Sequence, residues 1–161
     1  FSSQRGPSPR AISDINPQKV QRAKEQIGTF QSLVPEVLTG TETAWEAAMS
    51  AEIADLALIC TPWEWHTKMA LKAMENGLHA ASEVPIAYTP EDSIELVRTA
   101  EATQRHCLML ENCCYNREEL WILNMIEEGV FGTVTHAECA YLHDWRQLRT
   151  DPNYYEDRWR L

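Results

Sequence analysis

Short apolar runs alternate with segments of helical pattern along most of this 161-residue chain. The clearest run, LALIC at 56–60, is apolar at every position, and Thr61-Pro62 stops it. Residues 63–76 then carry apolar side chains at helical spacing and end before Gly77. A strand that is apolar throughout is typical of one covered on both faces. Because parallel strands need a long connection that packs back on the sheet, the repeated strand-helix order predicts a doubly wound α/β fold with a parallel sheet.

The same order recurs on both sides of this unit. We expect strands at 11–12, 34–38, 56–60, 79–81 and 107–110. We expect helices at 17–28, 44–49, 63–76, 89–104 and 116–128, with Asn16 as the cap of the first. From residue 133 to 141 the pattern changes towards alternation, which predicts a longer strand of a different, antiparallel sheet.

This change of pattern predicts a domain boundary near residue 115. Residues 1–9 are rich in Ser, Pro and Arg and are expected to form a disordered lead-in. Residues 10–115 would then hold the parallel sheet. Residues 116–161 would begin a second, α+β domain that is cut short.

Composition excludes several classes of protein. The formal net charge of -10 makes the average surface repel phosphate backbones, which argues against a general nucleic-acid binder. No run approaches the ~18 apolar residues that a membrane span needs. The five cysteines have no paired spacing typical of a zinc site, so we expect no metal and interpret them as buried small hydrophobic residues. They are Cys60, Cys107, Cys113, Cys114 and Cys139.

In open α/β sheets, ligands bind beyond the carboxyl ends of the strands. Asp14 follows the first expected strand, where dinucleotide-binding folds place the acidic residue that accepts hydrogen bonds from the adenosine ribose. Such a carboxylate would repel a ribose 2′-phosphate, so NAD is favoured over NADP. A simple turn aspartate is the alternative. The glycine-rich turn expected roughly 20 residues earlier would lie outside this chain.

Three more polar segments follow strands, at 61–66, 83–85 and 111–115. The first places two indoles, a carboxylate and an imidazole at the opening turn of a helix, whose free N–H groups suit an anionic ligand. Ordinary packing is the alternative for the indoles, and a local hydrogen bond is the alternative for His66. Glu83 and Asn112 could bond to a nicotinamide, its ribose or a substrate hydroxyl, or could simply cap their loops.

The TP-x-x-x-H motif at 61–66 and the SEVP segment at 82–85 resemble the Gfo/Idh/MocA oxidoreductase family, in which TP-x-x-x-H and E-K-P follow successive strands. More narrowly, the strings TPWEWHTKMA, LMLENCCYNREELWILNM and GVFGTVTHAE are similar to glycoside hydrolase family 109, the NAD-dependent α-N-acetylgalactosaminidases. The resemblance runs from about Ala11 to the end of the chain. It implies that 10–115 is a partial NAD-binding Rossmann domain without its first strand, and that 116–161 begins the substrate domain.

One departure from the wider family separates its branches. Sugar and inositol dehydrogenases of the E-K-P type carry a lysine that takes part in proton transfer, and here that position is Val84. An isopropyl group neither donates nor accepts a proton. The sequence therefore resembles the hydrolase branch rather than the ordinary dehydrogenases.

The resemblance implies a tightly held NAD that is used catalytically and not consumed. Hydride would leave sugar C3 for the nicotinamide, and the resulting ketone would acidify the hydrogen on C2. A base could then remove that hydrogen and expel the anomeric substituent, after which water adds and the hydride returns.

The resemblance also implies roles for individual residues. The residues expected to line NAD are Asp14, Trp63, Glu64, Trp65, His66, Glu83, Val84 and Asn112. Tyr141 and Arg160 would touch the sugar, Tyr115 is a catalytic candidate near the reacting carbon, and the main base is expected beyond Leu161. The expected partner is a small-molecule sugar, and a homo-oligomer formed through the C-terminal sheet stays open.

Two rival functions stay open as well. A plain NAD-dependent sugar dehydrogenase would release NADH in proportion to substrate, whereas the glycosidase would show no net NADH. A non-catalytic dinucleotide-binding domain would keep the fold without the chemistry, and the fragment as given is expected to be inactive.

Overall fold

A computed structural model describes residues 6–32, 35–144 and 146 of the chain. The chain divides into two compact units, residues 1–109 and 110–161, and each is described by itself. Most of the expected lead-in and all of the chain after 146 lie outside the described residues.

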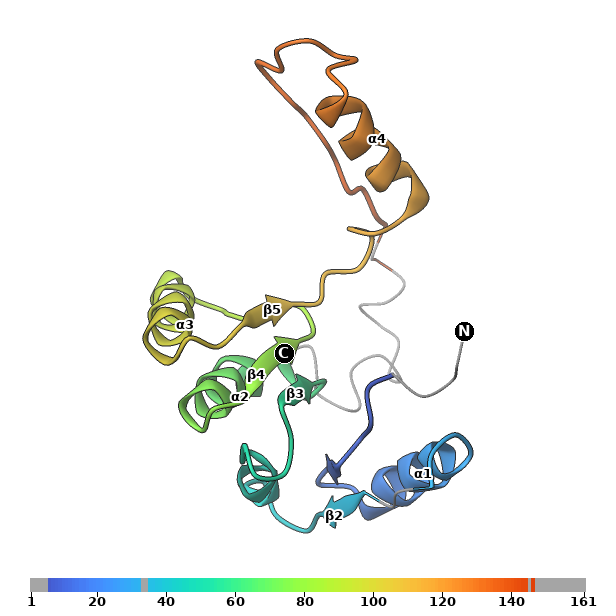
Figure 1. Ribbon diagram of the computed structural model, residues 1–161, viewed down its shortest axis with the longest axis vertical. Coiled ribbons are helices and arrows are strands. Elements are labelled where there is room, and N and C mark those ends of the chain that lie inside the picture. Colours follow the sequence, from blue (N-terminus) through green and yellow to red (C-terminus); the bar gives the residue numbers. More distant parts are fainter. Residues whose placement is uncertain (1–5, 33–34, 145, 147–161) are drawn as a thin grey trace. The chain divides into compact units, whose positions relative to one another are not determined.

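The first unit repeats a strand followed by a helix (Figure 1). Its elements are β1 (Ala11–Ser13), α1 (Pro17–Gly28), β2 (Glu36–Leu38), the 3-10 helix η1 (Ala44–Ala48), β3 (Leu56–Ile59), α2 (Trp63–Glu75), β4 (His79–Ser82), α3 (Pro90–Thr103) and β5 (Cys107–Met109). The second unit contains α4 (Arg117–Glu127). The predicted alternation is confirmed, except that the short helix near residue 44 is a 3-10 helix.

The strand pairs found among the described residues are all parallel, as predicted. β1 pairs with β2, and β3, β4 and β5 form a second sheet in that order. A doubly wound dinucleotide-binding sheet has the order 3-2-1-4-5-6. In this order, β2 and β1 correspond to strands 3 and 2 of such a sheet. β3, β4 and β5 correspond to its strands 4, 5 and 6. No strand among the described residues corresponds to strand 1, which would lie between β1 and β3.

Local sequence signals fix where the helices begin. The Asn16 side-chain oxygen accepts a hydrogen bond from the Gln18 amide at 2.9 Å, and Pro17 occupies the first turn of α1, so the predicted cap is confirmed. At the start of α3, Thr89 and Asp92 form a reciprocal capping box.

Gly77 ends α2 in the left-handed region, with φ of +86°. A Cβ there would also lie 3.4 Å from the Ala51 Cβ. We expect Gly77→Ala to lower the free energy of unfolding by about 1–2 kcal/mol, because L-residues are strained at this φ. Gly28→Ala is the matched control: nothing lies within 4 Å of its added Cβ and its φ is not in the left-handed region, so stability should not fall. Urea unfolding of both variants checks this difference.

Helices α2 and α3 pack on one face of the β3–β4–β5 sheet and form the core (Figure 1). Met74 is fully buried in this cluster, which also contains Ile59 from β3 and Leu96 from α3. Burial of an apolar side chain of this size stabilises a fold by about 1.5–3 kcal/mol. This packing orients α2, and therefore the segment that opens it.

The opposite face of the same sheet carries exposed apolar side chains. Leu56 and Leu58 are 50% and 64% exposed, while Ala57 and Ile59, which alternate with them along β3, are buried. Leu108 of β5 lies in the same row as Leu58 and is also exposed. The prediction that this strand is covered on both faces is wrong for the described residues, because only α2 and α3 cover it.

The 3-10 helix η1 joins the two sheets of the first unit. It contacts β1 and β2. Its Trp45 ring lies edge-on to Trp65 of α2, with 6.3 Å between centroids. The Asn76 amide donates to the Met49 carbonyl at 2.6 Å, and Met49 packs into the core of the β3–β4–β5 sheet.

The second unit is described only in part. Helix α4 buries none of its residues within the described chain. Residues 133–144 form no strand, so the strand expected at 133–141 is not seen, since a strand requires a neighbour to satisfy its backbone groups. The prediction of buried cysteines is also wrong: Cys107 is half-buried and the other four are exposed. None of the described helices has the length and apolar character needed to span a bilayer.

Candidate cofactor-binding site

Asp14 lies directly after β1 and forms the turn into α1. Its Oδ1 accepts a hydrogen bond from the Asn16 amide at 2.7 Å, while the Thr39 hydroxyl donates to its backbone carbonyl at 2.8 Å. The Thr39 contact ties the carboxyl ends of β1 and β2 together. Its Oδ2 carries no hydrogen bond from the described part of the chain. The turn contact therefore occupies one carboxylate oxygen and leaves the other for a ribose hydroxyl.

The start of α2 follows β3 and has no side-chain cap. The Trp65 N–H donates to the Pro62 carbonyl at 3.0 Å, whereas the N–H groups of Trp63 and Glu64 have no such partner among the described residues. These two groups could serve a ligand, and a helix N-terminus favours an anion. Glu64 is exposed. The two indoles are half-buried and engaged edge-on, Trp63 with Tyr88 at 6.2 Å and Trp65 with Trp45. Their rings serve packing, which is the alternative considered for them above.

His66 is buried beneath this first turn, with 1% of its surface exposed. Its Nδ1 lies 2.7 Å from the Pro85 carbonyl oxygen, and its Nε2 lies 2.7 Å from the Thr61 carbonyl oxygen. The ring thus bridges the loop after β3 and the loop after β4. This is the local-hydrogen-bond alternative, and it turns both ring nitrogens towards the protein interior.

Glu83 and Val84 continue from β4 at the same edge of the sheet as Thr61. The Glu83 amide donates to the Ile59 carbonyl at 3.0 Å, so the ladder between β3 and β4 extends to this residue. Glu83 is exposed and Val84 is half-buried. The structure therefore brings together the segments 61–66 and 83–85, as the rule of carboxyl ends predicts.

Cys60 lies beside Glu83, a pairing that could not be predicted from the sequence. Partial burial of the thiol raises the pKa of Cys60, and the negative charge of Glu83 raises it further. Both effects disfavour the thiolate. Because the thiolate is the nucleophile, the thiol should react slowly at neutral pH although the residue is exposed.

Replacing Glu83 by glutamine removes one of these two causes. We expect Glu83→Gln to lower the pKa of Cys60 and to speed its alkylation by iodoacetamide at pH 7.5. Peptide mapping by mass spectrometry is required, because Cys113, Cys114 and Cys139 are exposed too. Glu101→Gln on α3 is the control and should leave the Cys60 rate unchanged. An unchanged rate in Glu83→Gln would show that the two groups are not coupled.

The remaining candidates belong to the second unit. Asn112 is exposed, and its amide lies 3.8 Å from the Cys113 sulfur. Tyr115 and Tyr141 are 78% and 75% exposed, and the Tyr141 ring packs against His143 at 4.1 Å. Arg160 lies outside the described residues. The roles expected for these four residues stay predictions.

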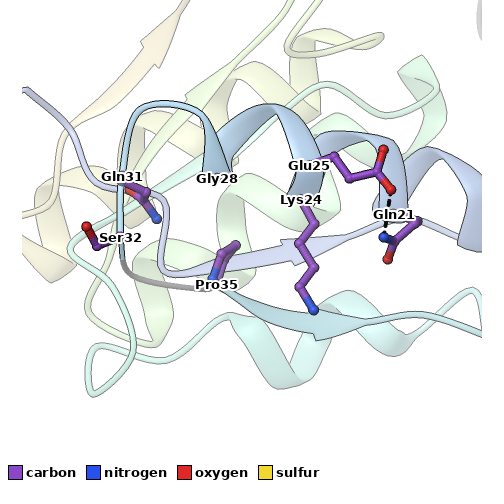
Figure 2. A pocket seen from close by; sticks show the side chains of 7 residues that line it. All are labelled: Gln21, Lys24, Glu25, Gly28, Gln31, Ser32 and Pro35. Carbon is purple, nitrogen blue, oxygen red and sulfur yellow. Dashed lines mark hydrogen bonds between the residues drawn. The ribbon is translucent and has the colours of Figure 1, made fainter.

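A surface hollow beside α1 is separate from these segments (Figure 2). It is lined by Gln21, Lys24, Glu25, Gly28, Gln31, Ser32 and Pro35. The Gln21 amide donates to the Glu25 carboxylate at 2.9 Å across one turn of the helix. No expected site residue lines this hollow, so we assign it no part in cofactor binding.

Comparison with protein families divides the chain into two parts. Residues 2–111 match the family described as oxidoreductase family, NAD-binding Rossmann fold (Gfo/Idh/MocA). Residues 115–160 match the C-terminal domain of glycosyl hydrolase 109. The first match covers more than half of the chain, and the second follows it directly.

Curated relatives agree with this division. The chain is 42% identical over 151 residues to glycosyl hydrolase family 109 protein 1 of Shewanella sp. strain MR-4. It is 41% identical, over the same length, to a protein of Shewanella oneidensis named alpha-N-acetylgalactosaminidase. Each match covers 94% of this chain and 33% of the relative, so the chain spans about a third of the length of these relatives.

Solved structures share the fold. A levoglucosan dehydrogenase in complex with NADH and levoglucosan matches with a TM-score of 0.64 at 24% identity, over 76% of this chain and 31% of that one. The WlbA dehydrogenase of Bordetella pertussis, in complex with NADH and UDP-GlcNAcA, matches with a TM-score of 0.60 at 24% identity, over 76% and 35%. The chain therefore belongs to the Gfo/Idh/MocA oxidoreductase family, whose NAD-binding Rossmann fold it shares, and within that family it groups with glycoside hydrolase family 109.

Proposed function

We propose that the full-length protein is an NAD-dependent glycosidase that hydrolyses α-N-acetylgalactosaminides through transient oxidation at sugar C3. The observation that carries this proposal is Val84. It occupies the place of the lysine that dehydrogenases of the family use for proton transfer, at the carboxyl end of β4 beside the start of α2. The relative named alpha-N-acetylgalactosaminidase supports the choice of sugar.

The described residues fit a bound NAD. Asp14 offers a free carboxylate oxygen for the adenosine ribose, and the uncapped first turn of α2 offers N–H groups for phosphate. We assign Glu83 and Val84 to the nicotinamide end and the Trp63, Glu64 and Trp65 segment to the wall beside it, with His66 buried beneath that segment. Asn112 belongs to the second unit, and its contact with the nicotinamide is proposed from the sequence resemblance alone. When bound, NAD supplies a reversible hydride acceptor.

The substrate side belongs to the second part of the chain. We propose residues 10–115 as the NAD-binding part and 116–161 as the start of the substrate domain. Tyr141 and Arg160 would hold sugar hydroxyls, and Tyr115 would lie near the reacting carbon. Once C3 is a ketone, the C2 hydrogen is acidic enough for a general base of modest strength, which we place beyond residue 161.

The test is turnover of a chromogenic α-N-acetylgalactosaminide by the full-length protein in deuterated water. We expect release of the phenol, deuterium at C2 of the product and no net NADH. A 3-deoxy analogue of the substrate is the matched control and should not be cleaved, because it cannot be oxidised at C3. Cleavage without C2 exchange would reject the oxidation route.

The same assay separates the rival functions. Stoichiometric NADH with no phenol released would identify a sugar dehydrogenase. NAD binding without NADH or phenol, across a panel of α-linked N-acetylhexosaminides, would identify a non-catalytic binding domain. Either result would overturn the proposed glycosidase.

A further inference from the structure

Two consecutive residues of α2 hold the loop that follows β4. His66 Nδ1 lies 2.7 Å from the Pro85 carbonyl oxygen, and the Thr67 hydroxyl donates to the Ile86 carbonyl oxygen at 2.8 Å. Both side chains are buried, with 1% and 9% of their surfaces exposed. The two contacts therefore join neighbouring residues of the helix to neighbouring residues of the loop.

Carbonyl oxygens of an irregular loop require partners where water cannot reach them, because an unpaired buried one costs about 1–3 kcal/mol. Pro85 and Ile86 are half-buried. Here α2 supplies the partners from its side chains. His66 Nε2 also lies 2.7 Å from the Thr61 carbonyl oxygen. A ring with one N–H donates to only one of the two carbonyls, and a ring with two N–H groups donates to both. Thr67 has no such ambiguity, since a carbonyl oxygen can only accept from its hydroxyl.

The residues that make these contacts directly follow, along the chain, the two segments assigned to NAD. The residues before His66 are the opening turn of α2, and the residues before Pro85 are Glu83 and Val84. A ring this deeply buried, with each nitrogen facing a backbone carbonyl, has no atom left for a cofactor. Its effect on a bound ligand must pass through the loops that it holds.

We propose that His66 and Thr67 are positioning residues that hold the Glu83-Val84 loop against the start of α2 and thereby set the affinity for NAD. This inference rests on the proposed function only for the assignment of those segments to the cofactor. A displacement of about 1 Å in a positioned site is enough to weaken its contacts substantially.

Thr67→Val is the sharpest test, because valine keeps the shape and removes the hydroxyl. We expect the dissociation constant for NAD of the full-length protein, measured by calorimetry without sugar, to rise about 10-fold, a loss of about 1.4 kcal/mol. Thr67→Ser keeps the hydroxyl and should restore most of the affinity. An unchanged dissociation constant in Thr67→Val would overturn the proposal.

Thr103→Val is the matched control. The Thr103 hydroxyl donates to the Thr99 carbonyl at 2.7 Å within α3, so this variant loses the same kind of bond far along the chain from the site segments. It should lose stability without losing NAD affinity. An equal loss of affinity in both valine variants would show a general effect of destabilisation and would overturn the proposal.

A second measurement needs no substitution. On addition of NAD, hydrogen exchange of the wild-type protein should slow both in peptides covering 60–68 and in peptides covering 83–88. The reason is that the His66 and Thr67 contacts, called the clamp below, couple the two segments. Protection confined to one of the two would contradict the coupling. Because no sugar is present, failure of the glycosidase assay with a positive Thr67→Val result would reject the proposed reaction and leave the clamp standing.

Discussion

Replacing Asp14 by alanine is expected to weaken NAD binding by the full-length protein about 10- to 150-fold. The physical reason is the loss of hydrogen bonds between a charged carboxylate and the ribose hydroxyls, each worth about 1.5–3 kcal/mol. The variant also removes the bond from the Asn16 backbone N–H to Oδ1, but the Thr39 hydroxyl still donates to the backbone carbonyl of residue 14, so the turn should keep this second contact. Calorimetric titration with NAD measures the change.

The same variant should narrow the preference for NAD over NADP, since removal of the carboxylate also removes its repulsion of a 2′-phosphate. Asp55→Ala is the control. Asp55 is exposed and precedes β3, at the amino end of the strand, where no ligand is expected. If Asp14→Ala binds NAD as tightly as the wild type, Asp14 is only a turn residue.

The largest effect on stability is expected for Met74→Ala. Met74 is 0% exposed in the core between the β3–β4–β5 sheet and helices α2 and α3. Truncation of a buried methionine costs about 2–5 kcal/mol, because the lost contacts leave a cavity that closes only in part. The free energy of unfolding of a native protein is about 5–15 kcal/mol, so this loss is a large fraction of the total. The midpoint of urea unfolding should fall accordingly.

Met109→Ala provides the comparison within the same unit. Met109 is 43% exposed at the end of β5, so its truncation should cost much less. Equal losses in the two variants would mean that the core does not lie where α2 meets the sheet.

Local features of the fold were predictable from the sequence. Asn16 caps α1 and Gly77 closes α2 because their chemistry acts within a few residues. Leu56 and Leu58 were expected to be buried, and they are exposed. Whether a second face of a strand is covered depends on elements far along the chain, and the composition of the run carries no information about them.

The same distinction applies to the candidate site. The rule that ligands bind beyond the carboxyl ends of strands selected the segments at 61–66 and 83–85, and these do meet. The direction in which His66 points could not be predicted, because it depends on a loop 19 residues later that passes over the ring. The contact of Thr67 could not be predicted either. Threonine occurs in many helices, and nothing in the sequence indicates that its hydroxyl bonds to the Ile86 carbonyl.

The order of the strands has a consequence for how cofactor binding and folding are linked, because no strand lies between β1 and β3 among the described residues. Any parallel strand entering there would acquire hydrogen bonds along both of its edges and merge two small ladders into one continuous sheet. In open α/β sheets a dinucleotide binds beyond the carboxyl ends of the strands, which would include the end of such a strand. NAD binding and the association of the two sheets would then depend on the same strand. A stronger association of the sheets would raise the affinity for NAD, and bound NAD would stabilise the association.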